Sequence, residues 1–285
     1  MSEYQVKVNE ATYMVQGPEG FLGAFGTNFW RSWVCPLYTP SGHNVVQEFP
    51  FDHPFHNGVF VGQNPVFCGE REANFWAFPV KRKHGDALME KQGRMDPQGK
   101  PEFEFGSRGV RFTLTSIWRD QNEEPILNER RIVRFRALPG ATECTIISEK
   151  TAAYGPVTFG KTKFGSIGVR VEPRLLPKLG GRVIGVRDGE LAYGSADEVA
   201  SGKDVDAVAY EADIPGVGTL GVCLTISMNS ASDSNRGPWF IRDYGMAMFN
   251  ATQDAPITLA EGESWEACLR VLAYEGPLQT TWFSK

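Results

Sequence analysis

The sequence contains no long apolar run, no signal-peptide pattern in its first residues and no CxxC motif. No stretch approaches the ~18–20 apolar residues that a membrane-spanning helix needs. The N-terminal MSEYQVKVNE has no basic-then-apolar pattern. The cysteines are odd in number and form no CxxC, which argues against a disulfide framework or a zinc knuckle; they are Cys35, Cys68, Cys144, Cys223 and Cys268. We therefore expect a reduced, cytoplasmic protein without a membrane span.

The sequence also lacks an excess of positive charge. Its 29 lysines and arginines face 34 aspartates and glutamates, which gives a net charge of −5. Because nucleic-acid affinity depends on clustered Lys and Arg, and no basic block occurs, we do not expect a nucleic-acid partner. No fixed-period repeat indicates a propeller or solenoid, and no low-complexity linker divides the 285 residues. We expect one domain over residues 1–285.

The composition and patterning favour β-structure. The 31 glycines and 18 prolines punctuate the chain at short intervals, and 12% of residues are aromatic. Within Gly109 to Trp118, apolar side chains alternate with polar ones, which is the period of a half-buried strand. Similar strands are expected at Arg130 to Arg136, Glu143 to Ser148, Ser166 to Val171 and Leu220 to Met228. The sequence therefore predicts an all-β fold, a large antiparallel β-sandwich with few short helices.

Two segments of the chain depart from the strand pattern. Only Ser195 to Ser201 has a helical character, and it is short. The polar, turn-rich stretch Lys91 to Lys100 is expected to be a surface loop. Because an all-β chain with unprotected sheet edges often pairs with another chain, a homo-oligomer or a partner subunit is among the expected partners.

A first polar cluster lies in Phe49 to Gly58, FPFDHPFHNG. His53 and His56 are three residues apart, Asp52 precedes them, and Asn57-Gly58 is a turn signal. A neutral imidazole acts as a general base, an acid or a metal ligand near neutral pH. The alternative is that both histidines only make local hydrogen bonds in a tight turn. Without a third ligand, two histidines are a weak metal signal.

A second cluster lies in Gly155 to Val171, GPVTFGKTKFGSIGVRV. Lys161, Lys163 and Arg170 flank closely spaced glycines, but the P-loop order GxxxxGK[ST] is absent. In one interpretation the segment is a hairpin with its cations on the solvent face. In the other, Lys163 faces an anionic or oxygen-rich ligand.

A third cluster lies in Met228 to Phe249. It is a long polar stretch with Asn235, Trp239, Arg242 and Tyr244. Sugar sites use aromatic rings against apolar sugar faces and Arg or Asn donors for the hydroxyls. The alternative is a core tryptophan surrounded by surface charges.

Three ordered motifs resemble those of the PmoA-like family, known as a domain of unknown function. They are Asp52 to Gly58 followed by Asn74-Phe75-Trp76, the segment Gly155 to Val171, and Ile241 to Tyr244 with Asn235, Arg236 and Trp239. The resemblance implies that the three clusters line one cleft. It also implies a carbohydrate context, since members look like neighbours of sugar oxidoreductases and isomerases. By analogy the fold is similar to the mutarotase-like supersandwich.

The chain departs from that family pattern at three positions. Phe55, Phe164 and Phe240 stand where the family has a histidine, a glutamate and a histidine. Each change removes an ionisable group and adds an apolar ring. We therefore expect a substrate with an aromatic or otherwise apolar part, such as an aryl glycoside.

The first functional hypothesis is an enzyme that acts on a glycoside or an oxidised (keto) sugar by acid–base chemistry. The reaction is elimination or hydrolysis of a glycosidic bond, or epimerisation. The predicted catalytic residues are His53, His56, Lys163 and Tyr244. The predicted substrate-binding residues are Asn57, Trp76, Arg170, Asn235, Trp239 and Arg242. No cofactor is expected.

Two alternatives stay open at the level of sequence. One is a non-catalytic carbohydrate-binding or regulatory subunit, which the three lost polar groups favour. The other is a metal-dependent enzyme in which His53 and His56 bind a divalent ion together with Asp52 or Glu129.

Overall fold

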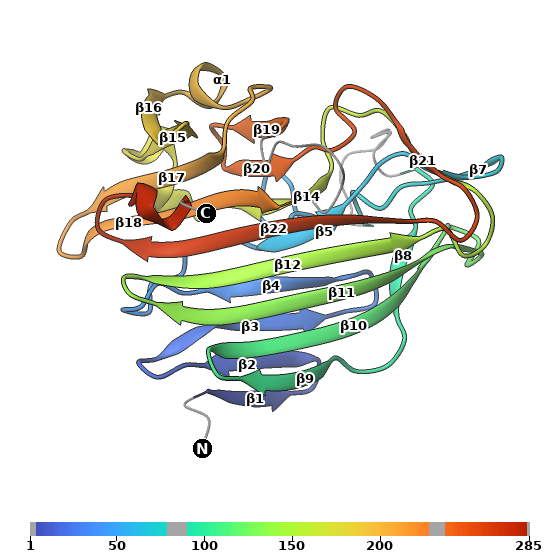
Figure 1. Cartoon of the computed structure of the whole chain (residues 1–285), viewed down its shortest axis with the longest axis horizontal. Helices are drawn as coiled ribbons and strands as arrows, with labels where there is room; N and C mark the ends of the chain where they lie inside the picture. The colour runs from blue at the N-terminus through green and yellow to red at the C-terminus, as the bar shows by residue number, and fades with distance from the viewer. Residues whose placement is uncertain (1–3, 79–89, 228–236, 284–285) are drawn as a thin grey trace.

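The computed structural model of the chain describes residues 4–78, 90–227 and 237–283, and all of its paired strands are antiparallel. Two large sheets lie face to face, with β1 to β4 behind β9 to β12 in the view of Figure 1. One hydrophobic core takes side chains from both sheets, for example Phe25, Val34, Phe112 and Phe135. The predicted all-β antiparallel sandwich is confirmed.

The eight-stranded sheet brings together segments that are distant in sequence. Its strands in spatial order are β1 (Gln5–Asn9), β2 (Thr12–Gln16), β3 (Phe21–Thr27), β4 (Ser32–Leu37), β5 (Val59–Gly62), β14 (Ser166–Arg170), β20 (Met246–Phe249) and β19 (Trp239–Arg242). Because β14 lies between β5 and β20, the strand that follows the first sequence cluster becomes a neighbour of strands that lie within the second and third clusters.

The second large sheet has ten strands. They are β16 (Glu190–Gly194), β15 (Arg182–Arg187), β17 (Ala207–Ile214), β18 (Gly218–Ser227), β22 (Ser264–Glu275), β12 (Ala141–Thr151), β11 (Pro125–Leu138), β10 (Gly109–Arg119) and β8 (Arg94–Pro97), with β9 (Glu102–Gly106) also on β10. A four-stranded sheet contains β21 (Ile257–Leu259), β13 (Val157–Phe159), β6 (Val66–Cys68) and β7 (Arg71–Ala73).

Helical structure is confined to short pieces among the described residues. They are α1 (Ala196–Val199) and the 3-10 turns η2 (Pro173–Leu175), η3 (Pro177–Leu179) and η4 (Thr280–Phe283). The helix falls within the predicted Ser195 to Ser201, where Ser195 and Glu198 form a reciprocal capping box. No helix in this part of the chain is long and apolar enough to span a membrane.

The period-two prediction holds for β10. Val110, Phe112, Leu114 and Ser116 are buried on one face, whereas the alternating side chains between them are partly or fully exposed. The other four predicted strands correspond to parts of β11, β12, β14 and β18, with Met228 outside the described residues.

Two expectations about the chain were wrong. Lys91 to Lys100 is not a loop throughout, because β8 (Arg94–Pro97) lies within it and pairs with β10. Met95 supplies the buried side chain of this edge strand, while Arg94 and Asp96 form surface ion pairs that hide its strand pattern. Gly155 to Val171 is not a hairpin either, since β13 and β14 belong to different sheets.

A buried ionic cluster lies on the inner face of β11 and β12. The carboxylate of Glu129 accepts bonds from Arg131, from the Trp118 indole N–H (2.8 Å) and from the Ser148 hydroxyl. Lys150 is completely buried, with its Nζ 4.6 Å from the centroid of Trp265. Burial, helped by the charge of Arg131 and opposed by that of Glu129, lowers the pKa of Lys150 to about 8.

Replacing Glu129 by glutamine tests how much its negative charge contributes to the stability of the folded chain. The change keeps the side-chain shape but leaves two buried cations without their counter-charge, so we expect a loss of ~3–5 kcal/mol in the free energy of unfolding. Glu149→Gln is the matched control, because its exposed ion pair with Arg130 is worth at most ~1 kcal/mol. Urea denaturation of both variants measures the difference, and equal losses would contradict this account.

Candidate functional site

The first predicted cluster is a loop that ends at the start of β5. Its backbone is closed by hydrogen bonds from Phe49 N to His56 O (2.9 Å) and from His56 N to His53 O (2.9 Å). The chain then turns at Gly58, which has φ +46° and whose Cβ, if present, would lie 2.0 Å from the carbonyl oxygen of Val34. Only glycine fits this close approach. The predicted turn at Asn57-Gly58 therefore sets the position of the histidine loop relative to β5.

Arg170, the last residue of β14, connects the loop to the second cluster. Its Nη2 donates to both carboxylate oxygens of Asp52, at 2.8 and 2.9 Å, although the side chain of Arg170 is only 4% exposed. The same carboxylate also contacts His53, whose Nδ1 lies 2.9 Å from Oδ2. Partial burial would raise the pKa of Asp52, but these hydrogen bonds and the positive charges lower it to about 2. Asp52 is therefore ionised throughout the neutral range.

His53 is oriented by that carboxylate. An ionised aspartate is only an acceptor, so the neutral imidazole of His53 carries its proton on Nδ1 and has a lone pair on Nε2. The side chain is 30% exposed, in contrast to the buried His56. His53 is therefore the more accessible of the two imidazoles.

His56 has the opposite arrangement. The Nη1 of Arg170 lies 3.5 Å from its Nδ1, and a guanidinium only donates, so the neutral imidazole carries its proton on Nε2. Burial lowers the pKa of His56 well below its ordinary value, and the charges of His53, Arg170 and Arg31 lower it further. His56 is therefore neutral at pH 7. Its Nε2 is buried and has no hydrogen-bond partner among the described residues.

Aromatic rings hold the two imidazoles in one stack. The ring of His53 lies between those of His56, 4.8 Å away, and Tyr244, 4.9 Å away, with interplanar angles of 2° and 10°. His56 also stacks on Phe60 and meets the edge of Trp76 at 5.4 Å. Burial raises the pKa of Tyr244, which keeps its phenol protonated. The stack fixes both rings without using their Nε2 atoms.

Arg31 is a site residue that the sequence reasoning missed. It is 2% exposed, its Nη2 donates to the carbonyl oxygen of Trp76 (2.7 Å), and its guanidinium lies over the rings of Phe60 and Phe78. Its Nη1 has no hydrogen-bond partner in the described part of the chain. Burial lowers the pKa of Arg31 to about 9, with a contribution from the charge of Arg131. At neutral pH it is a cation beside His56.

The three phenylalanines that replace family polar residues lie in the same cluster. Phe55 meets the edges of both histidines, and Phe164 packs 4.6 Å from Trp76 and 6.1 Å from Phe240. Phe55 thus contacts both histidines, whereas Phe164 and Phe240 extend the apolar cluster beyond Trp76. A substrate with an apolar part stays a prediction.

The remaining predicted residues have different surroundings. Asn57 is fully buried, and neither atom of its amide has a hydrogen-bond partner among the described residues. Lys163 is exposed in the bend before β14. Trp239 is buried in the core with its indole N–H on the carbonyl of Val205, and Arg242 binds Asp197 beside α1. Asn235, the last of the predicted residues, lies outside the described part of the chain.

The described part of the chain offers no set of ligands for the metal ion of the second alternative. No group of three or more His, Cys, Asp or Glu side chains there has an arrangement that could hold a metal ion. Glu129, named as a candidate third ligand, is bound to Arg131 in the core. All five cysteines are free.

The lowered pKa of His56 predicts how stability depends on pH. Below about pH 6.5 the unfolded chain binds a proton at this position that the folded chain does not. The free energy of unfolding should therefore fall from pH 7.5 to pH 5.5, by up to ~1.4 kcal/mol per pH unit for this residue. Asp52, with its pKa near 2, contributes only at lower pH.

His56→Gln should flatten this part of the curve. Urea denaturation at each pH gives the slope for the native chain and the variant, and the slopes matter rather than the absolute stabilities. Equal slopes for the two proteins would show that His56 is not held neutral by the fold.

Comparisons with solved structures find distant likenesses. A GH36 alpha-galactosidase from Geobacillus stearothermophilus is 10% identical, with a TM-score of 0.46 and coverage of 95% of this chain and 40% of that chain. A galactose 1-epimerase from Lactobacillus acidophilus is 12% identical, with a TM-score of 0.41 and coverage of 97% and 100%. A 4-alpha-glucanotransferase from Thermococcus litoralis is 9% identical, with a TM-score of 0.39 and coverage of 97% and 40%. We draw no functional conclusion from matches at this level.

The chain spans about two fifths of the length of the alpha-galactosidase that it matches. No curated protein matches the sequence. A family model does match: DUF6807, described as a family of unknown function, aligns with residues 26–283. The resemblance to PmoA-like proteins stays a prediction. Because the match extends over nearly the whole chain, the protein belongs to the DUF6807 family.

Proposed function

We propose that the protein is a carbohydrate-active enzyme that acts on a glycoside or a keto sugar by acid–base chemistry. The observation that carries the proposal is the pair of stacked histidines with opposite tautomers. Asp52 holds a proton on Nδ1 of His53, whereas Arg170 leaves the proton of His56 on Nε2. One imidazole thus offers a lone pair and the other an N–H, which are the two groups that proton transfer needs.

His53 acts as the base in this proposal. Its Nε2 takes a proton from the substrate, and the ionised Asp52 stabilises the imidazolium that forms, since it already bonds Nδ1. The arrangement is the one by which a buried carboxylate orients a catalytic histidine in other enzymes. Because Arg170 keeps the pKa of Asp52 near 2, the carboxylate does not take the proton itself.

His56 acts as the electrophile. A neutral imidazole held below its ordinary pKa donates a hydrogen bond from Nε2 to a developing oxyanion without losing its proton. The buried cation of Arg31 lies over the ring of Phe60, on which His56 stacks, and donates to the backbone carbonyl of Trp76. Its Nη1, which has no hydrogen-bond partner among the described residues, adds positive potential near that oxyanion.

These roles suit a keto sugar with an apolar aglycone. His53 removes the proton from the carbon between the carbonyl and the anomeric carbon, and the electron pair forms an enolate whose oxygen His56 and Arg31 stabilise. The enolate then expels the aglycone, which takes a proton from Tyr244 as it leaves. Epimerisation uses the same first step, followed by return of the proton to the opposite face.

A non-catalytic carbohydrate-binding subunit is the second candidate. The observation that favours it is the apolar cluster that contains Phe55, Phe164 and Phe240, because these rings occupy positions where the resembled family has ionisable groups. In this case sugars bind saturably and no bond is broken.

Turnover of aryl glycosides and their keto forms separates the two candidates. We expect His53→Ala to lower the rate of aglycone release by ~10²- to 10⁴-fold, the usual contribution of a general base. Asp52→Asn should lower it as well, since an amide no longer fixes the tautomer. His43→Ala is the control, because His43 lies outside the stack.

Solvent exchange provides a second measurement for the same variants. Incubation of the keto sugar in D₂O should place deuterium on the carbon beside the carbonyl with the native protein but not with His53→Ala. Saturable binding without exchange or release would favour the binding subunit. Release that disappears on chelation, with metal found by elemental analysis, would instead make the histidines ligands.

A further inference from the structure

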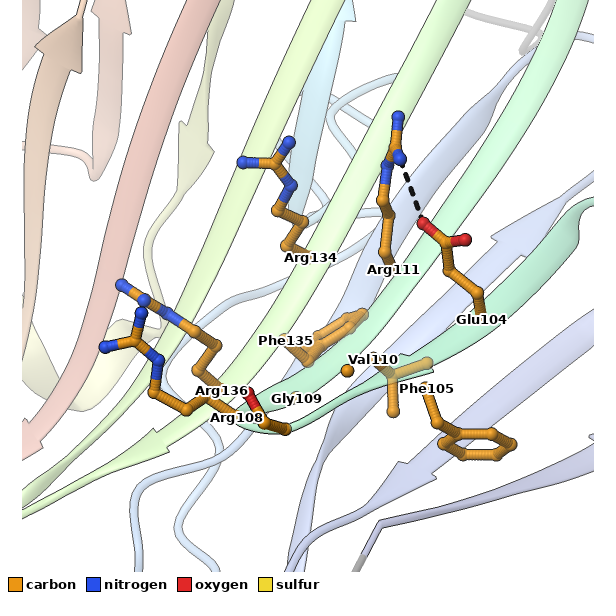
Figure 2. A pocket seen from close by; sticks show the side chains of 11 residues that line it. Glu104, Phe105, Arg108, Gly109, Val110, Arg111, Arg134, Phe135 and Arg136 are labelled. Atoms are coloured by element: carbon orange, nitrogen blue, oxygen red, sulfur yellow. Dashed lines mark hydrogen bonds and ion pairs between the residues drawn. The ribbon is translucent and has the colours of Figure 1, made fainter. Parts of the chain in front are cut away.

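A pocket separate from the histidine pair opens on the outer face of the ten-stranded sheet. It has a volume of about 260 Å³ and is formed by the β9–β10 hairpin and the neighbouring part of β11. Figure 2 shows four arginine side chains around it, Arg108, Arg111, Arg134 and Arg136, with Glu104 at one side. None of these residues belongs to the Asp52–His53–His56 site.

The arginines leave the pocket strongly positive. Four arginines and one glutamate line it, so the lining residues carry a net charge of +3. Arg111 Nη1 binds Glu104 at 2.9 Å, which accounts for that carboxylate. Arg136 binds Glu143, but Glu143 also accepts from Arg270 and is therefore shared.

The strand register places two of these positive charges opposite each other, which lowers the stability of the sheet. Arg111 of β10 lies directly opposite Arg134 of β11 in the antiparallel pair. Like charges at directly opposed positions destabilise a sheet. Arg134 is exposed and has no ion pair with any residue in the described part of the chain, and the Nε of Arg111 is buried without a hydrogen-bond partner there. The protein thus keeps two like charges opposite each other, of which only Arg111 has an ion-pair partner among the described residues.

We propose that this pocket binds a small oxyanion, as a free ion or as the phosphate, sulfate or carboxylate group of a ligand of monosaccharide size. Guanidinium groups match such anions because their planar N–H donors form paired, charge-assisted hydrogen bonds. The volume limits the body of the ligand, since pockets for larger molecules are ~300–1,000 Å³. Phe105, 47% exposed at the rim, offers an apolar surface to that body.

Thermal unfolding of the full chain tests the proposal with inorganic phosphate, sulfate, glucuronate and glucose at constant ionic strength. We expect the oxyanions to raise the unfolding midpoint relative to chloride. Glucuronate acting at the lowest concentration would identify a sugar acid, and phosphate or sulfate acting first would identify a tetrahedral anion. Glucose alone should have no effect through this pocket.

Arg134→Gln is the most informative variant, because it should raise the thermal stability of the chain and lower its affinity for the anion. Without oxyanion in low salt, the variant should unfold at a higher temperature than the native chain, since the repulsion with Arg111 is relieved. Its dissociation constant for the effective anion, measured by calorimetry, should rise ~10- to 100-fold. Arg108→Gln, which changes an exposed turn residue, should weaken binding without the gain in stability.

Arg130→Gln is the matched control on the same strand. Arg130 is exposed and paired with Glu149 outside the pocket, so its loss should leave the anion response unchanged. Equal midpoint shifts in the native chain and both pocket variants, or a chloride response as large as the oxyanion response, would overturn the proposal. Neither result depends on catalysis at His53, so the two proposals stand or fall separately.

Discussion

The arrangement of the candidate site depends on the buried guanidinium of Arg170. It bonds both oxygens of Asp52 and reaches the Nδ1 of His56, so one side chain sets the state of both histidines. A buried guanidinium is expensive unless its donors are used, and Asp52 supplies the compensating charge. Since Arg170 ends β14 between β5 and β20, the sheet topology itself brings this cation to the loop.

A second consequence of burial is a series of cations that runs from the loop into the core. The charge of Arg31 lowers the pKa of His56, and the charge of Arg131 lowers the pKa of Arg31. Arg131 in turn pairs with Glu129. The positive potential on His56 therefore comes from more than its immediate neighbour. This explains why His56 stays neutral.

Period-two alternation predicted β10 and the central strands well. In these strands successive side chains point alternately into the core and toward solvent, so apolar and polar residues alternate in the sequence. The spacing of Asp52, His53 and His56 also predicted a cluster, since three polar residues on a short turn stay together in any fold. The pattern failed at β8, where surface ion pairs give an edge strand a polar composition.

Long-range contacts account for most of what the sequence did not reveal about the site. Arg31 was missed although Trp30-Arg31-Ser32-Trp33 has the interleaving of aromatic residues with arginine that drew attention to the third cluster. Its contacts are with Trp76 and Phe60, which no local pattern links to it. For Trp239 the alternation within β19 decides the outcome, because Trp239 and Ile241 face inward while Phe240 and Arg242 do not.

The central claim is that the two stacked histidines hold opposite tautomers, and ¹⁵N NMR of histidine-labelled protein tests it most directly. Ring-nitrogen shifts recorded from pH 5.5 to 8, assigned with single His→Gln variants, report the tautomer and charge of each imidazole. The account predicts that His56 stays neutral with its proton on Nε2 and that neutral His53 carries its proton on Nδ1. A His56 that titrates near pH 6.5, or that has its proton on Nδ1, would contradict it.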